Sequence, residues 1–114
     1  MDAVEVTASL DPECVRPGGD VTITIASEPH ASVAYNAIYA DGQAGAPPPF
    51  GANYGGNAGG PSGEQGLYRD TWTVAPNAPS GPGHVEVVAG ANGGFGKTTV
   101  PFAVADAVTG TCDQ

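Results

Sequence analysis

Positive charge is nearly absent from this chain. Its 114 residues include 12 acidic side chains but only three basic ones (Arg16, Arg69 and Lys97), so the formal net charge is −9. Nucleic acids and anionic lipids are bound chiefly through clustered Lys and Arg, and three dispersed cations form no cluster. Long apolar runs are missing too, since no segment approaches the roughly 18 apolar residues needed to cross a bilayer. We therefore expect no nucleic-acid partner and no membrane insertion.

Cysteine is scarce, with Cys14 and Cys112 alone, and their spacing fits no zinc or redox motif. In an exported protein the pair would form one disulfide that closes most of the chain, whereas in a cytosolic protein both would stay free thiols. The disulfide is the favoured interpretation, and it predicts a secreted or cell-surface location. Met1 is followed directly by Asp2 without a basic or apolar leader, which predicts either that a signal peptide has been removed or that the chain is a segment of a larger exported protein.

Helical periodicity is also missing, and the 18 Gly and 11 Pro residues would interrupt any helix. Many of them lie in residues 41–66, which we expect to form one long flexible loop. Elsewhere apolar and polar residues alternate, most clearly where Val21, Ile23 and Ile25 are separated by threonines. This period of two indicates half-buried strands. The pattern predicts an all-β fold, an antiparallel β-sandwich forming a single domain over residues 1–114.

Four segments carry a family resemblance: VRPGGDVTITI (15–25), YADG (39–42), GLYRDTWTVAPNAPSG (66–81) and TTVPFAV (98–104). They resemble immunoglobulin-like domains of secreted bacterial proteins, especially actinobacterial ones. The resemblance implies an immunoglobulin-like sandwich of about seven strands. It also implies a non-catalytic role as spacer, adhesion module or binding platform. The chain departs from the antibody pattern, because no cysteine pair joins the central strands and Trp72 lies in a later strand than the antibody tryptophan.

Motifs for catalysis are weak. Residues 91–98 (ANGGFGKT) satisfy a relaxed phosphate-loop pattern, but a strand containing Pro101 follows where a phosphate loop needs a helix. The segment therefore predicts a hairpin turn and no nucleotide site. His30 and His84 are the only imidazoles, and neither has a spaced partner for a nucleophile or a transition metal. We expect that the protein is not an enzyme and has no cofactor.

Calcium binding is a further hypothesis, because loops rich in Asp, Asn and carbonyls can supply oxygen ligands. No Asp-x-Asp-x-Asp run supports it. Asp70 is predicted to share a face with Tyr68 and Trp72. It is interpreted either as a structural carboxylate held by hydrogen bonds or as a ligand-facing acid at the mouth of a cleft.

The 41–66 loop is the first place to seek a binding site, since long loops in compact domains are often functional. It carries Phe50 and Tyr54, with Tyr39 at its base. Exposed aromatics suit the faces of sugars and peptides, although these rings could instead fold back over the sandwich edge. The candidate ligand-binding residues are Tyr39, Phe50, Tyr54 and Asp70.

Three hypotheses follow. The first is a secreted or cell-surface spacer or recognition module with a protein or carbohydrate partner, working as a monomer or as one module of a larger chain. The second is a carrier of a hydrophobic or sugar ligand, held at the sandwich cleft or the 41–66 loop. The chain resembles enediyne-binding apoproteins of actinomycetes in size, acidity and architecture, a likeness of class alone. The third is a surface subunit that self-assembles through exposed strand edges.

Overall fold

The computed structural model describes residues 4–112, and all their regular structure is β. The strands are β1 (Thr7–Asp11), β2 (Cys14–Val15), β3 (Asp20–Ala26), β4 (Ser32–Ile38), β5 (Asn57–Pro61), β6 (Leu67–Thr73), β7 (Gly81–Ala91) and β8 (Gly94–Val104). The all-β prediction is confirmed, but eight strands replace the predicted seven or so. Within residues 4–112 there is no helix long and apolar enough to cross a membrane. The start at Met1 and Asp2 lies outside the described residues.

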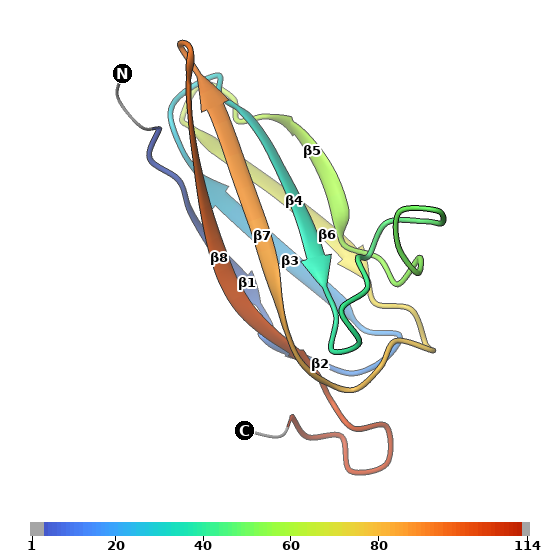
Figure 1. The fold of residues 1–114 in the computed structure, drawn as a ribbon. Coiled ribbons are helices and arrows are strands. Elements are labelled where there is room, and N and C mark those ends of the chain that lie inside the picture. The colour runs from blue at the N-terminus through green and yellow to red at the C-terminus, as the bar shows by residue number, and fades with distance from the viewer. Residues whose placement is uncertain (1–3, 113–114) are drawn as a thin grey trace.

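The strands form two sheets that face each other across one core (Figure 1). One sheet has the order β1-β3-β6, and the other has the order β2-β8-β7-β4-β5. Neighbouring strands are antiparallel except for β2 and β8, which run parallel. The alternation predicted for β3 holds, because Val21, Ile23 and Ile25 are all fully buried. Their partners across the core are the inward side chains of β4 and β7.

The N-terminal strand changes sheets at Pro12. β1 pairs with β3 in one sheet, and β2 then pairs with β8 in the other, where the amide of Ala103 donates to the carbonyl of Glu13. Since alternate residues of a strand direct their N–H groups the same way, the nitrogen of Pro101 also faces this side, away from β7. The missing N–H therefore costs no bond in the β7–β8 ladder. Pro101 thus lies just beyond the two residues of β8, Ala103 and Val104, that pair with β2.

The segment 41–66 is not one uninterrupted loop, because residues 57–61 form β5 and pair with β4. The glycines of this segment make room for rings from β6. A Cβ on Gly56 would lie 2.9 Å from Cε2 of Trp72, and one on Gly60 would lie 3.2 Å from Cε1 of Tyr68. The five-stranded sheet can therefore curl until β5 covers the edge of β6 (Figure 1). The sequence shows many glycines there but not the rings that require them.

The predicted hairpin turn at residues 91–98 is confirmed. Ala91 pairs with Gly94, which leaves Asn92 and Gly93 as a two-residue connection between β7 and β8. Both have positive φ, 52° and 79°, as the type I′ turn preferred in tight hairpins requires.

Candidate functional site

The loop between β4 and β5 is fixed at its base by backbone hydrogen bonds. A tight turn at residues 39–42 follows β4, and the amide of Tyr39 donates a hydrogen bond to the carbonyl of Gln43. Gly45 then donates to Ala37 and accepts from Gly55. A Cβ on Gly45 would lie 1.9 Å from the carbonyl oxygen of Gly55, so only glycine fits this close approach. The base of the loop is thus as well bonded as a strand pair.

Tyr39 is a buried anchor of this loop, with 2% of its surface exposed. Its hydroxyl donates to the carbonyl of Gly55 at 2.9 Å and accepts from Nε1 of Trp72 at 3.3 Å. Burial raises the pKa of Tyr39, and the bond from Trp72 opposes that rise. The ring also meets Phe102 edge-on at 5.3 Å, so the structure places Tyr39 in the core cluster.

Tyr54 lies over Tyr39, with the two ring centroids 5.0 Å apart in an edge-on arrangement. Its hydroxyl donates to Oδ2 of Asp41 at 2.8 Å, and this bond raises the pKa of Tyr54. Asp41 also accepts from the amide of Gln43 at 3.0 Å. The ring therefore folds back over the edge of the domain, the alternative that the sequence left open for the loop aromatics.

Phe50 behaves differently, since 83% of its surface is exposed. It follows three exposed prolines at residues 47–49, and its amide donates to the carbonyl of Pro47 at 3.1 Å. Behind this tip, the amides of Ala52 and Asn53 donate to Ala44 and Ala46. Phe50 is thus an exposed apolar ring on a braced loop, and the connection between β4 and β5 extends from the side of the domain (Figure 1). Of the four predicted residues, it is the most accessible to a partner.

Asp70 lies on the inner face of β6, paired in register with the buried Ile23. Its Oδ2 accepts a hydrogen bond from the hydroxyl of Tyr35, which reaches across from β4. Burial and then this bond raise the pKa of Tyr35, while burial and then the charge of Asp70 raise the pKa of Tyr68. The geometry matches the structural interpretation of this carboxylate, as an acid held by a tyrosine between the sheets.

Sequence reasoning did not single out Tyr35 and Asp41, although both belong to the same chain of contacts. The Tyr35 ring lies 5.4 Å from that of Trp72, which in turn donates to Tyr39. A continuous line of rings therefore joins Asp70 at one end to Asp41 at the other. Tyr35 lies two residues from each of the buried Val33 and Ala37, and this spacing could have predicted that it points inward. No local pattern could have predicted its partner, because Asp70 lies on a distant strand.

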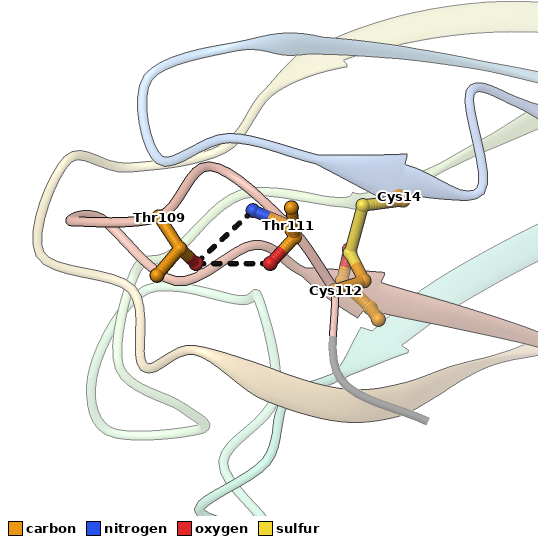
Figure 2. The surroundings of a disulfide bond; sticks show 5 residues. Cys14, Thr109, Thr111 and Cys112 are labelled. Carbon is orange, nitrogen blue, oxygen red and sulfur yellow. Dashed lines mark hydrogen bonds between the residues drawn. A yellow bond between two sulfur atoms is a disulfide. The ribbon is translucent and has the colours of Figure 1, made fainter.

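Cys14 and Cys112 form a disulfide with their Cα atoms 5.9 Å apart (Figure 2). The bond ties the segment after β8 back to β2. This segment turns on Asp106, whose carboxylate accepts from the amides of Val108 and Thr109, and these bonds lower the pKa of Asp106. The predicted pairing is confirmed, and such bonds are typical of oxidising compartments.

The surface of the described residues includes the following three hollows. One of about 420 Å³ lies among residues 5–7 and 26–28, and another of about 480 Å³ lies over residues 86–88 and 97–99. The third, about 350 Å³, is lined by the disulfide together with Glu13, Pro82, Gly83 and residues 101–103. Among residues 4–112, no three His, Cys, Asp or Glu side chains gather into a group that could hold a metal ion.

Comparison with known proteins gives no family for this chain. No family profile matches it, and no curated protein does. One solved structure of similar shape is a family 123 glycoside hydrolase from Clostridium perfringens, studied for glycolipid glycan hydrolysis, with a TM-score of 0.43 and 8% identity. The match covers 87% of this chain but 26% of that one, so the chain spans about a quarter of its length. At this level the similarity carries no functional argument.

Proposed function

We propose that this chain is a non-catalytic, immunoglobulin-like recognition or adhesion module of a secreted or cell-surface protein. The strand order supports the fold assignment. β1, β3 and β6 follow the order A-B-E of immunoglobulin domains, and β8, β7, β4 and β5 follow the order G-F-C-C′. The disulfide supports the location, because cytosolic thiols are kept reduced.

The recognition role rests on one observation, the exposed Phe50 on its braced loop. Aromatic side chains are enriched among the residues that dominate binding energies, and a loop whose backbone is already ordered loses little conformational entropy when it docks. An exposed ring flanked by three prolines suits an apolar pocket on a protein or the face of a sugar. A spacer role is compatible with the same architecture, because the first and last described segments lie at opposite ends of the domain (Figure 1).

The test compares wild type with Phe50→Ser on arrays of glycans and of extracellular-type peptides. Val108→Ser is the matched control, because Val108 is 94% exposed on the C-terminal segment. We expect Phe50→Ser to weaken binding at least about tenfold and Val108→Ser to leave it unchanged. Binding that survives Phe50→Ser would contradict the proposal, as would free thiols in protein recovered from its native compartment.

A carrier function is the second candidate, and the hollow at the disulfide favours it. Its wall includes Phe102, whose ring centroid lies 6.2 Å from that of Trp72, the chain's one tryptophan. An apolar ligand seated there should change the fluorescence of Trp72. Titration with an apolar dye and with short-chain fatty alcohols tests this candidate. Unchanged fluorescence at saturating ligand concentrations would count against it.

A further inference from the structure

The outward side of β5, β4, β7 and β8 is nearly uncharged in an otherwise acidic protein. We call this surface the neutral face. Val85, Val87 and Ala89 are buried on β7, so the residues between them point outward. Their acidic and basic side chains are one acid, Glu86, one lysine, Lys97, and one histidine, His84, whose Nε2 lies 3.4 Å from Oε2 of Glu86. Every other described acid lies elsewhere, although the whole chain has a net charge of −9.

The neutral face also exposes apolar surface. Val88 is 44% exposed and Phe95 is 68% exposed. Both lie on the same side as Glu86 and Lys97, because outward residues alternate along β7 and β8. The hollow of about 480 Å³ lies at this point, lined by residues 86–88 and 97–99. Exposed apolar side chains beside a hollow, with two opposite charges at its edge, match an interface in which apolar contacts are surrounded by polar ones.

The register fixes how these side chains are arranged. Val88 pairs with Lys97, and Glu86 pairs with Thr99, so the four residues form a quadrilateral. Glu86 and Lys97 occupy one diagonal. Strands lie about 4.8 Å apart and alternate residues about 6.7 Å apart. When two such faces meet in a symmetric dimer, the two-fold axis lies in the plane between them. An axis that places Glu86 of one copy opposite Lys97 of the other then runs close to the other diagonal, that of Val88 and Thr99.

From this arrangement we propose that the neutral face binds a second copy of this chain in a symmetric dimer. Lys97 of each copy contacts Glu86 of the other, and the two Val88 side chains meet near the axis. The occupant is a second copy because a two-fold interface must be self-complementary, and this face carries one charge of each sign in exchangeable positions. It is also the surface on which two chains of charge −9 approach without opposing their acids.

This proposal is independent of the role of Phe50. The sequence alone raised self-assembly through strand edges, whereas the geometry points to a sheet face.

The first test is a charge reversal measured by analytical ultracentrifugation over a concentration series. We expect the oxidised wild type to show a monomer–dimer equilibrium. Lys97→Glu and Glu86→Lys should each weaken dimerisation at least about tenfold, because each places like charges in contact. The double variant should return to within about threefold of wild type. Arg69→Glu is the matched control: it makes the same charge change as Lys97→Glu, but on the outer side of β6.

The second test is cross-linking. Val88→Cys should form an intermolecular disulfide under mild oxidation, because the two positions lie close to the axis. Thr71→Cys, exposed on the outer side of the other sheet, should stay monomeric under the same conditions. Circular dichroism confirms that each variant is folded. A wild type that stays monomeric at every concentration would overturn the proposal. So would cross-linking of Val88→Cys no faster than Thr71→Cys, or a double variant no tighter than the single ones.

Discussion

Alkaline pH should destabilise this protein through its tyrosines, because all four have a raised pKa in the folded state. Burial is the first cause for Tyr35, Tyr39 and Tyr68, and the hydrogen bond to Asp41 is the first cause for Tyr54. In an unfolded chain tyrosine ionises near pH 10. Above that pH the folded protein binds more protons than the unfolded one, so the free energy of unfolding falls as the pH rises.

Tyr35 allows the magnitude to be worked out. It is 3% exposed, and its hydroxyl donates to the carboxylate of Asp70, so its ionisation would place two negative charges in contact between the sheets. With Tyr35 still protonated in the folded protein at pH 12, the loss of stability between about pH 9 and pH 12 is about 2.7 kcal/mol. The slope approaches about 1.4 kcal/mol per pH unit. Such a loss is a large share of the 5–15 kcal/mol typical of a small domain. Tyr39 adds to it with the same sign.

Urea unfolding followed by circular dichroism between about pH 8 and pH 12 measures this effect. Tyr35→Phe is the matched variant, because it keeps a ring beside Trp72 but removes the group that ionises. Above pH 10 the wild type should lose about 1.4 kcal/mol more per pH unit than this variant. The near-ultraviolet absorbance of tyrosinate should rise together with unfolding. Full ionisation of the tyrosines in a folded protein, or equal slopes for the two proteins, would refute the reasoning.

Three further predictions concern stability. Replacing Cys14 and Cys112 together by serine should lower the free energy of urea unfolding by up to about 4.7 kcal/mol, since the bond spans 98 residues; an unchanged unfolding midpoint would contradict this. Pro101→Ala should change stability by less than about 0.5 kcal/mol, because the restored N–H faces away from β7. Gly83→Ala should cost about 2 kcal/mol or more, because its Cβ would lie 2.4 Å from the carbonyl oxygen of Ile38. Thermal unfolding of Pro101→Ala and Gly83→Ala checks these two predictions. Equal shifts of their unfolding midpoints would contradict the positions assigned to the two residues.

The sequence by itself determined which residues form most of the strands and which faces they bury. Alternation is a local property, and the burial of Val21, Ile23 and Ile25 follows from two-residue periodicity alone. The tight turn at Asn92 and Gly93 and the position of Pro101 are local in the same way, since each depends on the backbone limits of one or two residues. The pairing of Cys14 with Cys112 was predictable because the chain has no other cysteine.

Only the tertiary structure decided what the loop aromatics and Asp70 contact. Tyr35 lies 35 residues from Asp70, and no local pattern states which distant hydroxyl reaches a buried carboxylate. Glycines 56 and 60 promote flexibility in an isolated chain, yet in the fold they provide the space that lets β5 lie against Trp72 and Tyr68. Phe50 lies in the 41–66 segment and Tyr39 at its base, but Phe50 is exposed and Tyr39 is buried. Whether each ring is buried depends on long-range packing between strands, which the local sequence does not encode.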